Sequence, residues 1–403
     1  MPRVAGGGAG DAIPPLLRDA MALHASGRVV EAAALYARVL KRSPRDGNAL
    51  NLAGVAARQL GDLPRALEHG RRAVMGAPTS AIFRANYGAT LASAGRLPEA
   101  VAEFRAALAG RPDDAVTWRN MGQAMAALGD ASGAVPVLER AVAIAPSAPE
   151  AWLALAHARR EAGDAPGARE AARRAVAPPV AEQAAFLLAA LGEGDAPGRA
   201  PADYVRSLFD QFAPRFDGEL TALGYATPAA LAALIEASGV SPARALDVLD
   251  LGCGTGLSGV PLAPFARRLV GVDLSPRMLA EAGKRGLYDA LEEADLLEWL
   301  PAHPAAFDLV VAADVLNYLG DLGPAVAGIA GALRPGGRAA FSVETGDVVP
   351  FALGEGMRYR HAPAHVATLL DAAGFRVEVA RAVVLRQEKG VPVAGTLFLT
   401  QRR

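Results

Sequence analysis

A glycine-rich segment preceded by an acidic residue is the part of the sequence whose residue types and spacing best suit ligand binding. It reads DLGCGTGLSG and begins at Asp250, inside a long apolar run. Gly254, Gly256 and Gly259 satisfy the G-x-G-x-x-G pattern of dinucleotide-binding turns. Gly252, Gly254 and Gly256 also give G-x-G-x-G, with the carboxylate two residues before the first glycine. Glycine suits either pattern, because a backbone without Cβ atoms can approach a ligand closely.

Two cofactors are compatible with such a turn, NAD(P) and S-adenosylmethionine (SAM), and the acidic residues decide between them. Asp250 would repel a pyrophosphate but suits the positively charged amino end of a methionine moiety. Asp273 ends the next apolar segment, where a carboxylate accepts hydrogen bonds from ribose hydroxyls. Asp295 ends a third segment and can accept a hydrogen bond from an adenine amino group. We therefore expect a SAM site, with further cofactor contacts at Gly252, Gly254, Gly256, Leu274, Met278, Leu296 and Ala313.

From about residue 245, short β-branched segments alternate with segments of helical length. The expected strands cover residues 245–251, 268–274, 288–296, 307–315, 337–344, 375–386 and 394–402. Nearly continuous apolar strands separated by helices are typical of a parallel sheet covered on both faces, which binds ligands outside the carboxyl ends of its strands. The last two strands are joined by the short segment QEKGVP, which favours an antiparallel pair. We predict an α/β, Rossmann-like sheet of seven strands.

The first half of the chain repeats with a period of 34 residues. The repeat is marked by glycines at positions 27, 61, 95, 129 and 163. Each glycine is followed by an alanine five residues later, and four of them by a proline 17 residues later. The alanine allows two helices to pack closely, the glycine ends the first helix at positive φ, and the proline ends the second. Such helix pairs must stack to bury their apolar faces, which predicts an all-α solenoid.

Residues 13–191 resemble five tetratricopeptide (TPR) repeats followed by a capping helix. The segment AVTWRNMGQAMAALGDASGAVPVLERAVAIAP is close to the family pattern. In TPR arrays the inner helix faces bind an extended peptide or another protein. Alignment by the period places these polar residues on that face: Asn48, Asn51, Arg58, Gln59, Arg119, Gln123, His157 and Arg160. The resemblance implies a groove for a protein or peptide partner, with self-association or packing on the second domain as the alternative.

The segments LDLGCGTG (249–256) and LRPGGRAAFSVE (333–344) resemble signatures of class I SAM-dependent methyltransferases. The lead-in segment YVRSLFDQFAPRFDGELTALGYATPAALAAL is similar to that of bacterial members with N-terminal TPR repeats. The resemblance implies a SAM-dependent methyltransferase domain over residues 202–403. The glycines, prolines and charges of residues 192–201 predict an exposed linker in front of it.

In the resembling proteins the aromatic lead-in folds over the cofactor. Tyr204, Leu208 and Phe212 recur at four-residue spacing with Phe209 beside them, so they form one helical stripe. Such a stripe belongs either to the core or to a lid that excludes water. Pro214 is expected to end the helix and to leave the aromatic residue at position 216 in the following turn.

The sulfonium of SAM is already an activated leaving group, so the main task of the protein is alignment. We expect the acceptor beyond the ends of the strands at 307–315 and 337–344. His361 is the base candidate by its ordinary pKa, with Tyr318 as a second catalytic candidate, although a surface or capping histidine fits equally well. The acids Glu344 and Glu388 either bind the acceptor or pair with a base such as Arg386.

The composition narrows the class of protein further. The 403 residues are 52% hydrophobic and 21% charged, which predicts a folded chain of two or more domains. Lys plus Arg (41) nearly balance Asp plus Glu (42), so the basic excess of nucleic-acid binders is missing. The single cysteine, Cys253, forms no internal disulfide, and we interpret it as a small residue of the cofactor turn. Without signal-peptide, membrane-span or zinc-ligand patterns, we expect a cytoplasmic protein that binds neither membrane nor metal.

Three functions are compatible with these features. The leading hypothesis is a SAM-dependent methyltransferase whose solenoid recruits a protein substrate or partner. The first alternative is an adaptor whose SAM-binding domain has no catalytic activity. The second is a small-molecule methyltransferase in which the TPR region forms a dimer. The sequence leaves the methyl acceptor open.

Overall fold

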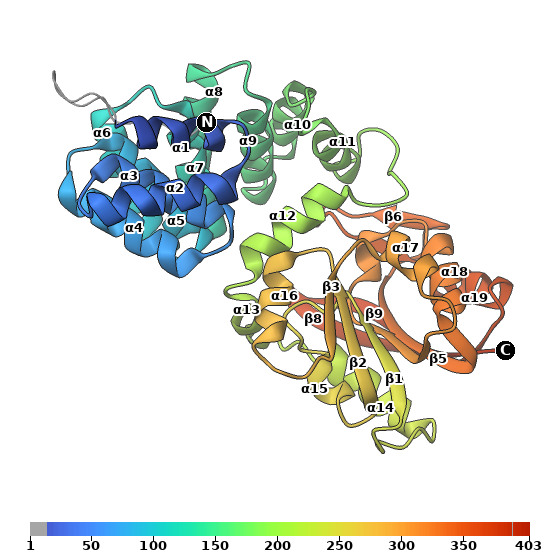
Figure 1. Cartoon of the computed structure of the whole chain (residues 1–403). Helices are drawn as coiled ribbons and strands as arrows, with labels where there is room; N and C mark the ends of the chain where they lie inside the picture. Colours follow the sequence, from blue (N-terminus) through green and yellow to red (C-terminus); the bar gives the residue numbers. More distant parts are fainter. Residues whose placement is uncertain (1–13, 389) are drawn as a thin grey trace. The chain divides into compact units, whose positions relative to one another are not determined.

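The computed structural model describes residues 14–388 and 390–403, so the predicted start of the solenoid at residue 13 lies outside the described residues. The chain divides between Ala184 and Ala185 into two compact units (Figure 1). The first unit is helical and the second is built on a β-sheet. This is the fold class that the sequence predicts.

In the first unit, consecutive helices pack against one another along the chain (Figure 1). The helices are α1 (Pro15–Ala25), α2 (Val29–Arg42), α3 (Gly47–Gln59), α4 (Leu63–Gly76), α5 (Ala81–Ser93), α6 (Leu97–Gly110), α7 (Ala115–Ala127), α8 (Ala131–Ile144), α9 (Pro149–Glu161) and α10 (Ala165–Arg174). Asp46, Asp62 and Asp114 each accept a hydrogen bond from the backbone N–H three residues later. These side chains therefore cap the starts of α3, α4 and α7.

The 34-residue period corresponds to one helix pair. All five repeated glycines lie in the turn within a pair, with φ between 75° and 86°, where glycine is unstrained. The alanine five residues after each is fully buried, at positions 32, 66, 100, 134 and 168. Two further glycines, Gly88 and Gly122, lie seven residues before Gly95 and Gly129. An added Cβ would lie 2.8 Å from Phe104 at Gly88 and 2.5 Å from Leu138 at Gly122. Small residues therefore permit the close helix contacts that the sequence predicts.

Helix α11 (Ala181–Ala190) lies across the boundary between the units. Its Phe186 ring is fully buried and has its centroid 5.4 Å from that of Tyr204 and 6.1 Å from that of Tyr359. Phe186, Tyr204 and Tyr359 all lie in the second unit, so the second half of α11 belongs to that unit.

Residues 192–201 follow α11 and were expected to form an exposed linker. The carbonyl of Gly198 accepts a hydrogen bond from the N–H of Gly320, and the N–H of Ala200 donates to the carbonyl of Tyr318. Ala200 is 2% exposed. The end of this segment is thus bonded to the loop that follows the central strands of the sheet.

The second unit contains a mixed sheet (Figure 1). Its strands are β1 (Leu246–Leu251), β2 (Ala266–Asp273), β3 (Ala290–Glu293), β4 (Phe307–Ala312), β5 (Leu333–Thr345), β6 (Phe351–Leu353), β7 (Tyr359–His361), β8 (Phe375–Glu388) and β9 (Val391–Arg402). The parallel strands lie in the order β3-β2-β1-β4-β5. Strand β9 pairs antiparallel with β5, and β8 pairs antiparallel with β9, which confirms the predicted terminal hairpin. Two short strands were not expected from the sequence: β7 pairs parallel with the end of β5, and β6 pairs antiparallel with β7.

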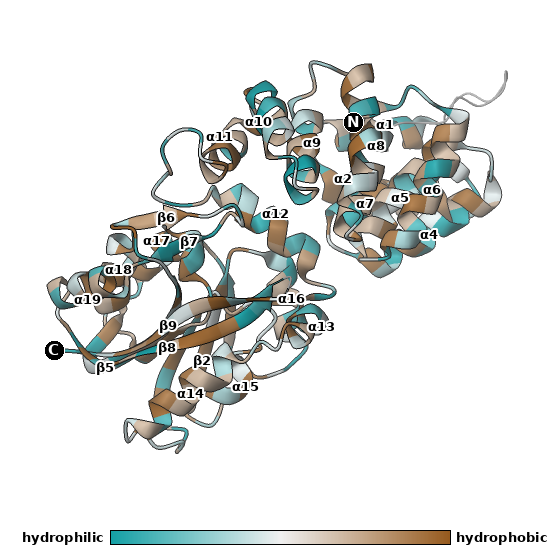
Figure 2. Ribbon diagram, turned by 180° about the vertical axis from the view of Figure 1, so that it is seen from behind, coloured by the Kyte–Doolittle hydropathy of each residue, from teal (hydrophilic) through white to brown (hydrophobic). Residues whose placement is uncertain are grey.

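Helices cover both faces of this sheet (Figure 1 and Figure 2). Helices α14 (Thr227–Ala237) and α15 (Gly259–Leu262) pack on one face. Helices α17 (Leu296–Trp299), α18 (Gly323–Ala332) and α19 (Pro363–Ala372) pack on the other. The two hydrophobic cores that result hold the parallel strands in register and leave their carboxyl ends for the loops.

Three further helices lie around the carboxyl edge: α12 (Ala202–Phe212), α13 (Phe216–Ala222) and α16 (Pro276–Gly283). Figure 2 shows that α12 carries both hydrophilic and hydrophobic residues. Among the described residues no single helix is long and apolar enough to cross a membrane, and α13 and α14 reach that length only together, with a bend of 76°.

Candidate functional site

The glycine-rich loop follows β1 as the sequence predicts. Gly252, Gly254 and Gly256 all have positive φ, at 67°, 54° and 84°. A Cβ on Gly252 would lie 2.2 Å from Val315 Cγ2. The loop therefore needs glycine both for its backbone conformation and for its close contact with the residues after β4.

Asp250 lies beneath this loop and is fully buried. The Tyr288 hydroxyl donates to its Oδ2 over 2.6 Å, whereas Oδ1 has no hydrogen-bond partner among the described residues. Burial raises the pKa of Asp250 to about 7, and the nearby Asp273 adds to this while the bond from Tyr288 opposes it. A buried carboxylate with an unused oxygen is costly unless a donor or a cation reaches it.

Tyr288 explains the third glycine of the G-x-G-x-x-G pattern. An added Cβ would lie 2.6 Å from the Tyr288 Oη at Gly259, 2.9 Å from its Cε1 at Gly271, and 3.0 Å from its Cε2 at Gly256. These three glycines therefore make room for one tyrosine ring. Gly259 serves this packing, so the dinucleotide pattern arises here without a phosphate-binding role for that residue.

Asp273, at the end of β2, connects the glycine loop to the next loop. Its Oδ2 accepts from the N–H of Gly254 over 2.8 Å, and its Oδ1 accepts from the N–H of Ser275 over 2.8 Å. Burial raises the pKa of Asp273, opposed by these backbone hydrogen bonds. The predicted cofactor contacts Leu274 and Met278 follow in the same loop and in α16, and Met278 is fully buried.

Asp295 follows β3 and caps α17 by accepting a hydrogen bond from the N–H of Leu297 over 3.0 Å. Arg199 also forms an ion pair with it. Leu296, the adjacent predicted contact, is partly buried. Ala313, after β4, is likewise partly buried. The predicted cofactor residues thus lie at the carboxyl ends of β1 to β4, along one edge of the sheet.

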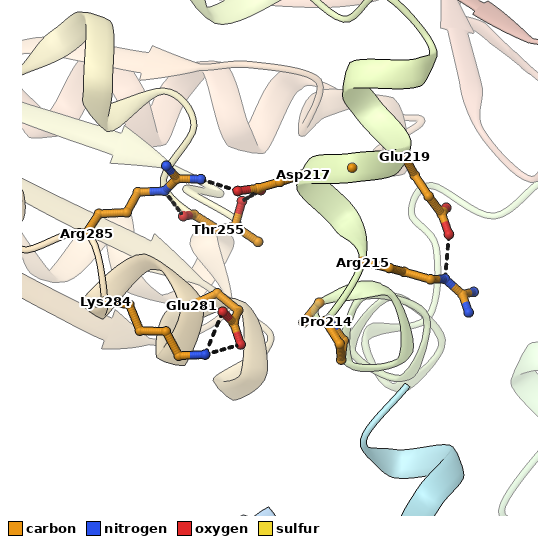
Figure 3. Close-up of a pocket in the computed structure, with 10 residues that line it drawn as sticks. Pro214, Arg215, Asp217, Glu219, Thr255, Glu281, Lys284 and Arg285 are labelled. Atoms are coloured by element: carbon orange, nitrogen blue, oxygen red, sulfur yellow. Dashed lines mark hydrogen bonds and ion pairs between the residues drawn. The ribbon is translucent and has the colours of Figure 1, made fainter. Parts of the chain in front are cut away.

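The lead-in helices are bonded to the same edge. The carboxylate of Asp210, in α12, accepts from the hydroxyl of Ser275 over 2.6 Å. Asp217, in α13, accepts from the hydroxyl of Thr255 in the glycine loop over 2.5 Å and pairs with Arg285 (Figure 3). These bonds fix α12 and α13 to the loops after β1 and β2.

A pocket of about 540 Å³ opens beside α13 and borders the glycine loop at Thr255 (Figure 3). Its charged residues are paired, Arg215 with Glu219 and Lys284 with Glu281. The lining is therefore close to neutral overall.

The aromatic residues of the lead-in lie near the loop after β4. The Phe209 ring packs edge-on against Phe216 and Tyr318, with centroid distances of 6.1 and 5.4 Å. Helix α12 has no fully buried residue, so its stripe is not core. Phe216 begins α13 rather than lying in a turn, because the helix resumes directly after Arg215.

The two predicted catalytic residues lie beyond β4 and β5. Tyr318 ends the 3₁₀-helix η2 (Leu316–Tyr318), and burial raises the pKa of its phenol. His361 ends β7, is 1% exposed, and has Nε2 3.1 Å from the carbonyl of Gly320. Because a carbonyl only accepts, Nε2 carries the proton and Nδ1, which has no partner among the described residues, is the unprotonated nitrogen. Burial lowers the pKa of His361.

A network of two arginines and two glutamates lies in the same region. Glu344, at the end of β5, accepts from Arg358 over 2.6 Å and also from Arg386. Glu388 accepts from the same two arginines, over 2.5 Å and 2.7 Å. Glu344 and Arg386 are 4% and 8% exposed. Of the two sequence alternatives for these acids, the structure shows the pairing with Arg386, and it adds Arg358, which spacing alone did not connect to them.

Asp314 links this network to the rest of the edge. It has a positive φ of 56°, which is uncommon outside glycine. Its carboxylate accepts from the hydroxyls of Ser342 over 2.8 Å and Thr227 over 3.2 Å. The strained residue thus holds the ends of β4 and β5 to the start of α14.

The predicted partner residues of the first unit all lie on the first helices of their pairs. Asn48, Asn51, Arg58 and Gln59 are in α3, Arg119 and Gln123 in α7, and His157 and Arg160 in α9. Among the described residues, Asn48 Oδ1 and Arg119 Nε are buried without a hydrogen-bond partner. Burial, with a smaller contribution from Arg160, lowers the pKa of His157 to about 3, so this residue is neutral near pH 7.

The carboxyl edge suits SAM better than a dinucleotide. The N–H of Gly254, which would face a phosphate, is bonded to Asp273, and Asp250 adds a second buried carboxylate. Two such groups repel a pyrophosphate and favour a cation. Asp250 Oδ1 has no hydrogen-bond partner among the described residues, so it is an available acceptor for a cationic group. Among the described residues no group of three His, Cys, Asp or Glu side chains is placed to hold a metal ion.

Family models match segments of both units. Residues 249–341 match the family model of the methyltransferase domain, and residues 17–81 and 115–158 match models of the tetratricopeptide repeat. The chain thus combines N-terminal TPR repeats with a C-terminal domain of the SAM-dependent methyltransferase family, and SAM is the cofactor of that domain.

Curated relatives match part of this chain. The trans-aconitate 2-methyltransferase of Pseudomonas aeruginosa is 42% identical over 93 residues, which are 22% of this chain and 33% of the relative. The ubiquinone biosynthesis O-methyltransferase of Sodalis glossinidius is 30% identical over 141 residues, which are 33% of this chain and 56% of the relative. The chain thus spans between a third and just over half of the length of these relatives.

Two solved structures are each similar to part of this chain. The 1,6-didemethyltoxoflavin-N1-methyltransferase of Burkholderia thailandensis is 25% identical, with a TM-score of 0.41, over 52% of this chain and 93% of its own. A thermophilic TPR protein of Thermus thermophilus is 27% identical, with a TM-score of 0.36, over 40% of this chain and 88% of its own.

Proposed function

We propose that the protein transfers the methyl group of SAM to an acceptor bound beyond the carboxyl ends of β4 and β5. The proposal is supported above all by Asp250, a fully buried carboxylate beneath the glycine loop whose Oδ1 has no partner among the described residues. Asp250 would hold the methionine end of SAM, and Asp273 and Asp295 its adenosine. SAM supplies an electrophilic methyl group when bound, and α12 and α13 would exclude water from it.

The residues beyond β4 and β5 would position the acceptor. We retain Tyr318 and His361 as candidate catalytic residues. His361 would take a proton through Nδ1, but its lowered pKa makes it a weak base. Alignment of the acceptor with the methyl group would therefore supply most of the rate enhancement.

We further propose that the TPR unit recruits a protein, as a substrate or as a partner, and that the enzyme works in the cytoplasm. The polar inner helix face supports this, since Asn48 Oδ1 and Arg119 Nε are buried groups with unused hydrogen-bonding capacity. The proposed domain boundaries are 13–191 for the solenoid and 202–403 for the methyltransferase domain.

A second candidate is a methyltransferase that acts on a small molecule. It is favoured by the names of two relatives, which refer to trans-aconitate and to ubiquinone biosynthesis. In that case the TPR unit would serve association of the enzyme rather than substrate recruitment.

One experiment separates these candidates. The full chain is incubated with methyl-labelled SAM and a cell extract, and label is measured in the protein and small-molecule fractions. The test variant combines Arg119→Ala with Gln123→Ala, and the control is Arg140→Ala in α8. Recruitment through the TPR unit is supported if the test variant loses the label in the protein fraction and the control keeps it. Label confined to small molecules favours the second candidate, and no label in any fraction contradicts methyl transfer.

A further inference from the structure

Three aromatic rings from separate parts of the second unit form a continuous group. Phe209 comes from α12, Phe216 from the start of α13, and Tyr318 from η2 after β4. Phe209 is the central ring, in edge-on contact with the other two, at centroid distances of 6.1 Å to Phe216 and 5.4 Å to Tyr318. We call these three rings the aromatic group.

The aromatic group lies at the proposed cofactor site. A Cβ built on Gly254, in the middle of the glycine loop, would lie 3.7 Å from Phe216 Cε1. At the other end, Tyr318 follows the strand β4, which is the neighbour of β1. The bond between Asp210 and Ser275 holds α12 to the loop after β2. The rings therefore extend from the glycine loop to the end of β4, over the carboxyl edge of the sheet.

The rings have surface left for a ligand. All three side chains are partly buried rather than enclosed. The cation–ring contacts among the described residues involve Trp152, Phe212 and Phe307, and none of the three rings of the aromatic group. Their negative faces are thus not used by an arginine or lysine of the chain.

We propose that the aromatic group recognises the positive charge of the SAM sulfonium and makes the site prefer SAM to its product, S-adenosylhomocysteine (SAH). The inference rests on the proposed function. A cation beside an aromatic face is attracted by the ring quadrupole, and the attraction is larger where water is excluded. SAH has a neutral thioether in place of the sulfonium, so it gains nothing from this interaction. The preference would help the product to leave after methyl transfer.

A hydrophobic lid makes a different prediction. If the rings only cover the site, their loss weakens SAM and SAH equally, because both molecules have nearly the same shape. If the rings recognise charge, their loss weakens the binding of SAM and leaves the binding of SAH nearly unchanged. The ratio of the two dissociation constants therefore separates these roles without any measurement of activity.

Isothermal titration of the full chain with SAM and with SAH gives this ratio. The test variant is Phe209→Leu, which keeps an apolar side chain in a helix with no fully buried residue. The matched control is Phe212→Leu in the same helix, whose ring lies 4.9 Å from the guanidinium carbon of Arg215 and outside the aromatic group. We expect Phe209→Leu to weaken SAM binding by about 3- to 30-fold and SAH binding by less than about 2-fold. The control should leave the ratio unchanged.

A second pair of variants keeps the test independent of helix α12. Tyr318→Phe retains a ring and should retain the preference, whereas Tyr318→Leu should lose it. Equal effects on SAM and SAH in Phe209→Leu and Tyr318→Leu, or a larger effect on SAH, would overturn the aromatic group as a charge-recognition site. Absence of binding of either molecule to the unaltered chain would instead contradict the proposed function itself.

Discussion

The hydrogen bond between Tyr288 and Asp250 gives a prediction whose size follows from the structure. Tyr288→Phe removes the hydroxyl that donates to Asp250 over 2.6 Å and leaves this fully buried carboxylate without a hydrogen bond among the described residues. A hydrogen bond to a charged group contributes about 1.5–3 kcal/mol, and one to a neutral group about 0.5–1.5 kcal/mol. The destabilisation should therefore depend on whether Asp250 is ionised.

The direction of the pH dependence follows from the pKa of Asp250. In the folded chain it is about 7, above the ordinary value of 3.8, so the folded state holds this proton more tightly. The contribution of Asp250 to stability is then full below about pH 4 and is lost as the pH rises to about 7, by about 4 kcal/mol in total. Without the Tyr288 bond the charged form becomes less favourable, so the pKa rises further.

We expect Tyr288→Phe to lower the free energy of unfolding by about 1–2 kcal/mol more at pH 8.5 than at pH 5.5. Tyr288 itself stays protonated over this range, because burial and then Asp250 raise its pKa. Urea unfolding followed by Trp299 fluorescence measures the second unit alone if Trp118 and Trp152 are replaced by Phe in all variants. Adding Asp250→Asn should abolish the pH dependence of the Tyr288 effect. Equal destabilisation at both pH values would contradict a hydrogen bond from Tyr288 to an ionising Asp250.

Three further predictions concern the carboxyl edge. Gly252→Ala should destabilise the second unit by at least about 2 kcal/mol, because the φ of Gly252 is 67° and the added Cβ would contact Val315. Gly286→Ala is the control for backbone strain alone, because Gly286 has a φ of 62° and open space around it. Equal effects of the two substitutions would contradict the contact with Val315. Arg386→Met should cost about 1.5–3 kcal/mol at pH 7, because Glu344 keeps Arg358 but loses the hydrogen bond from its second arginine. No loss of stability in urea unfolding would contradict the network. Asp217→Asn should speed the release of SAH in stopped-flow measurements, because α13 loses its charged contact with Arg285. An unchanged release rate would show that α13 does not control the release of SAH.

The periodic parts of the fold could be predicted from the sequence. Each glycine of the 34-residue repeat is found at positive φ, and all seven expected strands are present. These features depend on local residue type and on a pattern repeated many times. The strands β6 and β7 were missed because each has three residues, too few for a periodic signal. Their position is set by pairing with the end of β5.

The long-range contacts of the site could not be predicted. The bond from Tyr288 to Asp250 joins residues 38 positions apart, and nothing in either segment identifies the other. The ion pair of Arg199 with Asp295 arises because the residues before α12 are bonded to the loop after η2, although their composition is that of a linker. The glycines at positions 256, 259 and 271 are small because they leave space for the ring of Tyr288. This relation becomes evident only when the strands are placed, because the glycines belong to different segments of the chain.

We propose that two buried carboxylates at the carboxyl edge hold a positively charged, adenosine-containing methyl donor. Isothermal titration of SAM into the unaltered chain and into Asp250→Asn tests this most directly, with circular dichroism to confirm that the variant is folded. We expect one SAM bound per chain and an affinity at least about 10-fold weaker in the variant. No heat from SAM in the unaltered chain, or equal affinity in both proteins, would contradict it.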